Sequence, residues 1–155
     1  MCPAALPVGA EAFAIAAEPA PVGDAGGFSR MAACRIVGVA PSALARLETA
    51  LAAEADHRLP ARLAFSDLLA LAVAREIVGR LGLGAAAYTV GLRDLLLLLA
   101  ARPELDLLDP FVALVGRDFA RLTDLPHDHL RAANHGFVVV PLAPILSELR
   151  DLVFS

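Results

Sequence analysis

The 155-residue sequence contains no tryptophan, and aromatic residues make up only 5% of it. Large rings therefore contribute little to any core. Hydrophobic residues still make up 58% of the chain, and most of them are Ala, Leu and Val. A chain of this length can bury roughly 70% of the surface that it exposes when unfolded. We therefore expect a core of closely packed helices built from small and aliphatic side chains.

Cysteines and long apolar segments are also scarce. The two cysteines are Cys2 and Cys34. Because the first lies in a predicted tail and the second in a predicted helix, we expect no disulfide framework. Uninterrupted apolar stretches such as residues 95–101 fall far short of the ~20 residues that cross a bilayer. The first residues carry no Lys or Arg ahead of an apolar segment, so we expect no secretory signal peptide. Together these features predict a cytoplasmic protein with no membrane partner.

Lysine is absent, so all 13 basic residues are arginines, and 17 acidic residues give a net charge of -4. The distribution is uneven. In residues 28–65, five arginines against three acidic residues give +2, whereas eight against fourteen elsewhere give -6. Only the basic segment would attract a polyanion such as DNA.

The chain divides by composition into a tail and two further regions. Residues 1–27 mix Pro, Ala and Gly without a sustained period, which predicts a flexible tail with at most a short helix at residues 10–17. An ordered domain is expected over residues 28–101. Residues 102–155 are expected to form a helical region for dimerisation or partner binding. The predicted fold class is mostly α.

Local signals in the ordered domain predict two short helices separated by a tight turn. Ser29 can cap a first helix that ends near Ile36, and Gly38 can supply the positive φ that terminates it. Pro41 suits the first turn of a second helix over residues 41–53. An irregular to extended basic segment follows, in which a proline blocks helix formation.

The rest of the chain is predicted to form more helices and one strand. Five consecutive leucines at residues 95–99 predict a helix buried on most sides or packed against a second subunit. Three consecutive valines favour a strand at residues 137–142. The other predicted elements are a third helix from a Ser66 cap to Gly82, a fourth over residues 89–101, a fifth from Asp109 and Pro110 to Leu122, a short sixth after Pro126 and a last helix from Pro144.

The order of short helix, tight turn, second helix, basic segment and long helix resembles the MerR-type winged helix-turn-helix domain of bacterial regulators. The resemblance covers residues 28–99, about half of the chain. It implies that the second helix enters the DNA major groove while a wing contacts flanking phosphates. The matching residues are Ser29, Ala32, Ala33, Ile36, Gly38, Val39, Leu44, Glu48, residues 62–71 and residues 81–83.

The resemblance also implies which residues contact DNA. Ser42 and Arg46 are four residues apart and therefore share one face of the second helix. Arg46 would donate to a guanine edge or to a phosphate. This face is poor in donors, because Ala40, Ala45 and Leu47 stand where family members often carry polar or aromatic residues. The implied DNA-binding residues are Ser29, Arg30, Ser42, Arg46, Arg58 and Arg62.

Simpler explanations exist for several of these features. Residues 29–53 match an ordinary helical hairpin as well, and Arg58 and Arg62 match a solvated loop. A histidine cluster at residues 127–135 suggests a metal site, but His127 and His129 would point to different sides of a helix, so no metal is predicted. The sequence has no nucleophile motif and no phosphate-binding glycine loop, so we predict no catalytic residues and no cofactor.

The sequence therefore predicts a non-catalytic, sequence-specific regulator that binds double-stranded DNA as a homodimer. The expected dimer contact involves residues 92–122, or strand pairing of residues 138–140 across a two-fold axis. A second hypothesis is a protein-interaction module, such as an antitoxin or adaptor that binds a partner protein. The acidic remainder of the chain and the donor-poor second helix motivate it. A third hypothesis is a ligand sensor, but no residue in the sequence indicates which ligand it would bind.

Overall fold

A computed structural model describes residues 27–81, 85–102, 108, 110–124 and 137–154. The predicted tail except Gly27, its short helix at residues 10–17, the sixth helix and the histidine cluster lie outside these residues. The described part is mostly helical, as predicted. Its elements are α2 (Arg30–Val37), α3 (Pro41–Glu54), α4 (Phe65–Leu81), the short helix η2 (Ala85–Tyr88), α5 (Thr89–Ala100), β1 (Val112–Gly116), β2 (Ala120–Thr123), β3 (Phe137–Pro141) and α7 (Leu142–Phe154).

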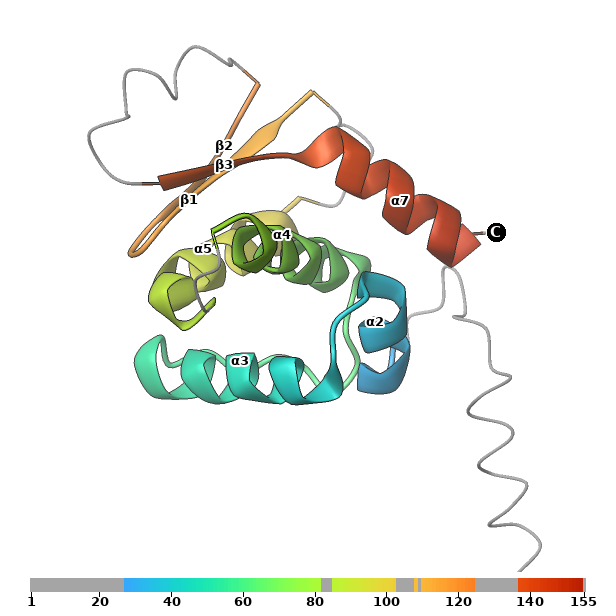
Figure 1. Cartoon of the computed structure of the whole chain (residues 1–155), viewed down its shortest axis with the longest axis horizontal. Helices are drawn as coiled ribbons and strands as arrows, with labels where there is room; N and C mark the ends of the chain where they lie inside the picture. The colour runs from blue at the N-terminus through green and yellow to red at the C-terminus, as the bar shows by residue number, and fades with distance from the viewer. Residues whose placement is uncertain (1–26, 82–84, 103–107, 109, 125–136, 155) are drawn as a thin grey trace, which may run out of the picture.

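The elements are arranged in layers. The three strands lie on one side of α4 and α5, and α3 lies on the opposite side (Figure 1). Helices α2 and α7 lie at the end of the molecule where α3 begins. None of the described helices and strands lies beyond α3 on the side that points away from the sheet (Figure 1).

The boundaries of α2 and α3 follow the predicted capping signals. The Ser29 hydroxyl accepts a hydrogen bond from the Ala32 amide at 3.1 Å, which satisfies a free donor at the start of α2. Gly38 ends α2 with φ 79°, the left-handed conformation that favours glycine. Pro41 then opens α3, where its missing amide costs no helical hydrogen bond. These predictions are confirmed.

The start of α4 differs in detail from the prediction. The helix begins at Phe65, so Ser66 is its second residue and not its cap. Asp67 performs the capping instead: its carboxylate accepts from the Ala64 amide at 2.8 Å. This reach back from the third helical residue is one half of a capping box. Asp67 is buried, so this hydrogen bond satisfies a charge that is largely removed from water.

The predicted fifth helix is wrong. Residues 112–123 form strands β1 and β2, and the region carries three strands where one was predicted. The strand order is β2-β1-β3, and both pairs are antiparallel. Val115 pairs with Ala120 at the end of the first pair, so residues 116–119 form the connecting turn. The predicted strand at residues 137–142 is confirmed as β3, and it pairs along the whole of β1.

The final helix starts two residues earlier than predicted, at Leu142, so Pro144 lies inside its first turn. Proline is tolerated there because the first amides of a helix have no internal partner. The leucine run at residues 95–99 lies on α5 as predicted. Leu95, Leu96 and Leu99 are buried, whereas Leu97 is 54% exposed.

The core is aliphatic, as the composition predicts. It is one cluster in which Leu, Ala and Val predominate, and apart from Ile77 the largest fully buried side chains are all leucines. Helix α5 approaches the sheet closely at Gly91, whose amide donates to the Arg117 carbonyl at 3.3 Å. This contact joins the helical layer to the turn between β1 and β2.

The basic segment does not form a two-stranded wing. Residues 55–64 contain one isolated bridge, in which Leu63 pairs with Phe28 through two backbone hydrogen bonds of 2.7 and 2.8 Å. Among the described residues, no single helix is long and apolar enough to cross a membrane. Helices α2 and α3 reach that length and apolarity only when they are counted together across their bend. The structure thus supports a helix pair followed by a loop, and it does not establish the winged form.

Candidate nucleic-acid interface

The axes of α2 and α3 differ by 111° across the break at residues 38–40. Helix-turn-helix motifs join two helices at about 90–120°. Ala33 and Val37 of α2 are buried, as are Leu44 and Leu51 of α3, so both helices are anchored in one core. The angle is therefore fixed by packing on both sides of the turn.

Helix α3 presents Ser42 and Arg46 to solvent. Both residues are exposed, and their spacing of four puts them on one helical face, away from the buried Leu44 and Leu51. No hydrogen bond or ion pair engages the Arg46 guanidinium within the part of the chain that the structure describes. The Thr49 hydroxyl donates to the Ala45 carbonyl at 2.9 Å, which leaves this face with few free donors.

Arg30 is engaged by a carboxylate. Its Nε donates to Glu48 Oε1 at 2.7 Å, and its Nη1 donates to the Ala61 carbonyl at 2.9 Å. The ion pair links α2 to α3 and the second bond links α2 to the basic segment. The ion pair between Arg30 and Glu48 also cancels part of the positive charge predicted for this surface.

Ser29 and Arg62 also have structural roles. The Ser29 hydroxyl is occupied as the cap of α2. Arg62 donates from Nη2 to the Gly27 carbonyl at 2.8 Å, beside the Phe28–Leu63 bridge. Arg58 is exposed, and the described residues provide no partner for its guanidinium. Of the predicted DNA-binding residues, Ser42, Arg46 and Arg58 are therefore the ones available to a ligand.

A residue that the sequence reasoning missed fixes α4 against its neighbours. Arg75 donates to the Val37 carbonyl at the end of α2 at 2.6 Å, to both Glu148 oxygens of α7 at 3.3 and 3.1 Å, and to Glu76 at 3.3 Å. The hydrogen bond to Glu148 is the main reason that the pKa of Arg75 is raised. No signal in the sequence could have identified Glu148 as the partner, because it is 73 residues away.

A cavity of about 200 Å³ lies in the angle between α2 and α3. Cys34 lines it beside Glu48, and burial, followed by the negative charge of Glu48, raises the pKa of the Cys34 thiol. The thiol is therefore kept in its protonated, less reactive form. Groups of His, Cys, Asp and Glu that could hold a metal ion do not occur among the described residues.

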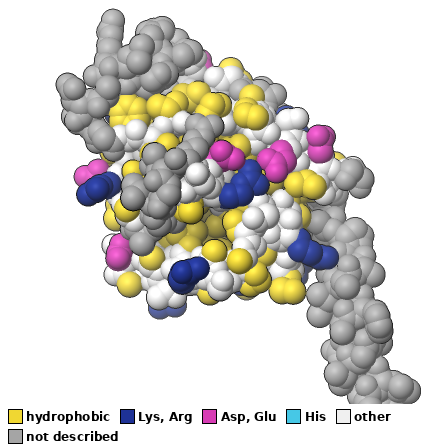
Figure 2. Space-filling model, viewed as in Figure 1, with side chains coloured by type: hydrophobic (Ala, Val, Ile, Leu, Met, Phe, Trp, Pro, Cys, Tyr) yellow, Lys and Arg dark blue, Asp and Glu magenta, His cyan; other side chains and the backbone are white. Residues whose placement is uncertain are grey.

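The face shown in Figure 2 carries no continuous basic patch. Its arginine side chains stand apart from one another, and hydrophobic side chains gather in a hollow near the middle of the face. On this face the described residues therefore carry their positive charge as separate arginines.

No family model, no curated protein and no solved structure matches this chain. The resemblance to MerR-type domains thus depends on the matching residues themselves, and function has to be argued from the geometry.

Proposed function

We propose that the protein is a non-catalytic DNA-binding regulator whose helix α3 enters the major groove. The observation that carries the proposal is the 111° bend that presents α3 with Ser42 and Arg46 exposed and Arg46 unpaired by any described carboxylate. A helix held at this angle by a tight turn is the geometry in which a recognition helix reaches base edges. Arg46 can then donate to a guanine or to a phosphate.

The available charge limits how strongly one chain can bind. Arg46 and Arg58 are exposed without a described partner, whereas Arg30 shares its charge with Glu48. Two chains would supply about four phosphate contacts, for which log affinity falls with log salt with a slope of about -4. We therefore propose a homodimer in the cytoplasm that binds an inverted-repeat site, with its contact at residues 92–122 or at β3.

Fluorescence anisotropy with a pool of random-sequence DNA duplexes tests this proposal. The affinity of the full chain should fall steeply as salt rises, and repeated selection from the pool should enrich an inverted repeat. Arg46→Ala should weaken binding in either role. Loss of a guanine contact costs about 1–3 kcal/mol and relaxes specificity, whereas loss of a phosphate contact lowers the salt slope by about 1 per chain.

Arg121→Ala is the matched control. Arg121 is also an exposed arginine, but it lies on β2, and the sheet is on the opposite side of α4 and α5 from α3 (Figure 1). Because Arg121 also falls within residues 92–122, size-exclusion chromatography first verifies that Arg121→Ala is as dimeric as the unaltered chain. In that dimer the loss of Arg121 should leave DNA affinity unchanged. A flat salt response, or an equal effect of the two substitutions, refutes the proposed interface.

A second candidate function is a protein-interaction module of the antitoxin or adaptor type. The Arg30–Glu48 ion pair favours it, because it neutralises the charge of Arg30 on the α2–α3 surface, and the engaged Thr49 hydroxyl removes a further donor from that surface. Purification from the native host after nuclease treatment distinguishes the two functions. A protein partner retained at one-to-one stoichiometry, lost in a variant of the exposed α3 face and accompanied by no DNA affinity supports the module.

A further inference from the structure

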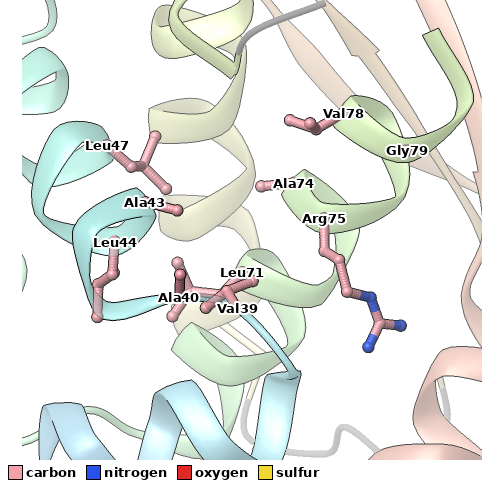
Figure 3. A pocket seen from close by; sticks show the side chains of 10 residues that line it. All are labelled: Val39, Ala40, Ala43, Leu44, Leu47, Leu71, Ala74, Arg75, Val78 and Gly79. Atoms are coloured by element: carbon pink, nitrogen blue, oxygen red, sulfur yellow. The ribbon is translucent and has the colours of Figure 1, made fainter. Parts of the chain in front are cut away.

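A second, larger cavity lies between α3 and α4, with a volume of about 320 Å³. The turn before α3 closes one end of it through Val39 and Ala40. Ala43 and Leu47 of α3 point toward Ala74 and Val78 of α4 across the opening (Figure 3). We call this cavity the α3–α4 pocket.

The pocket exists because the facing side chains are small. Ala43 and Ala74 face each other, and Gly79 adds no side chain at all. A Cβ built on Gly79 would meet nothing within 4 Å. Val78 consequently remains 41% exposed although it points toward α3. Apolar surface left in contact with water in this way favours a ligand that covers it.

The described lining of the pocket offers no free charge. Arg75 is the one charged residue among the described residues that line it. Its guanidinium is engaged by Glu148, Glu76 and the Val37 carbonyl, and it points away from the pocket (Figure 3). A charged ligand would lose its hydration here without gaining an ion pair, so its binding would be opposed.

We propose that the α3–α4 pocket binds an uncharged, apolar small molecule about the size of two fused aromatic rings. An apolar cavity of ~150 Å³ holds one benzene ring, and the α3–α4 pocket has about twice that volume. It also falls within the range of about 300–1,000 Å³ typical of small-molecule sites.

The proposal does not depend on DNA binding, so it is tested on the full chain without DNA. The probe is prodan, an uncharged naphthalene dye whose emission shifts to the blue when it leaves water. Prodan should titrate to one molecule per chain with a blue shift. Naphthalene should displace it, and naphthalene sulfonate should compete at least about tenfold less well, a factor that corresponds to about 1.4 kcal/mol.

Two variants fill the pocket and two serve as controls. Ala43→Leu and Val78→Phe enlarge side chains that already point into it, from opposite walls, and each should weaken prodan binding at least about tenfold. Ala53→Leu makes the first change at an exposed position of α3, and Ala45→Leu makes it in the smaller cavity between α2 and α3. Both controls should bind prodan like the unaltered chain. Circular dichroism of all four variants verifies that they fold.

Three results would overturn the proposal. They are an absence of saturable binding, a loss of binding in Ala45→Leu with retention in Ala43→Leu, and equal competition by naphthalene sulfonate. A fourth result would show that a second copy of the chain occupies the pocket instead. In that case prodan would bind only below the protein concentration at which the chain dimerises, and Val78→Phe would no longer dimerise.

Discussion

Replacing Gly91 with alanine tests how closely α5 approaches the sheet. A Cβ at this position would overlap the Gly116 carbonyl oxygen and lie 2.8 Å from the Phe119 carbonyl oxygen. Both are backbone atoms of the turn between β1 and β2, so no side chain can rotate away to make room. The helix or the turn must therefore shift, which disturbs the contacts of the buried Leu92 and Leu95.

The magnitude follows from three effects. Overpacking a rigid contact costs about 3 kcal/mol, at the upper end of the usual range. The hydrogen bond from the Gly91 amide to Arg117, already 3.3 Å long, would be lost at a cost of about 1 kcal/mol. Alanine regains about 1 kcal/mol in helix propensity. The expected net loss is about 3 kcal/mol, equivalent to a fall in Tm of about 6–12 °C for a domain of this size.

Urea denaturation followed by far-ultraviolet circular dichroism measures this loss, and Gly79→Ala provides the matched control. Gly79 is also helical, on α4, but its added Cβ would meet nothing within 4 Å. This control should therefore gain about 1 kcal/mol from helix propensity alone, the same gain as at Gly91. If the two substitutions change the free energy of unfolding equally, the close contact between α5 and the β1–β2 turn is wrong.

Three further predictions concern the polar contacts around α2. Arg75→Met should lower the free energy of unfolding by about 1–3 kcal/mol in urea denaturation, because α2 and α7 lose a shared charged donor to α4. Glu48→Gln releases Arg30 from its ion pair, so DNA affinity and its salt slope should both rise, whereas stability should change by less than about 1 kcal/mol. The raised pKa of Cys34 stabilises the fold below the ordinary thiol pKa, and this contribution is lost as pH rises through the higher folded value. Iodoacetamide at mildly alkaline pH should accordingly modify Cys34 more slowly in the folded chain than in urea, as measured by mass spectrometry of the Cys34 peptide.

The helices that the sequence predicted well are those with local boundary signals. Ser29, Gly38 and Pro41 act through hydrogen bonds and backbone angles within a few residues, so their effect does not depend on the rest of the fold. The prediction places the start of α4 two residues too late because Ser66 and Asp67 both suit a helix start. Burial decided in favour of Asp67, and burial depends on tertiary packing.

The strands β1 and β2 were mistaken for a helix for a physical reason. Short apolar runs suit either structure, and a proline at the start favours a helix as much as a loop. The stabilising partner of β1 is β3, much later in the chain, so its contribution is not visible locally. Gly116 and Asp118 lie in the turn between β1 and β2, and they were the available signal for a hairpin.

The candidate interface was predictable only in part. The exposure of Ser42 and Arg46 follows from helical periodicity, because Leu44 and Leu51 define the buried face of α3. The pairing of Arg30 with Glu48 could not be predicted, since it requires the 111° angle that brings α2 and α3 together. The α3–α4 pocket also requires two helices to face each other. The sequence of either helix alone does not indicate that they do.

The two proposals assign adjoining parts of one helix to different ligands. Leu44 and Leu51 hold α3 in the core, Ser42 and Arg46 face solvent, and Ala43 faces the α3–α4 pocket. Arg46→Ala should bind prodan normally, because its guanidinium does not line the pocket. Ala43→Leu can also alter DNA affinity directly, because residue 43 lies three positions before Arg46 and is therefore its neighbour on the helix surface. Val78→Phe, on α4, is the variant that should weaken prodan binding and leave DNA affinity unchanged.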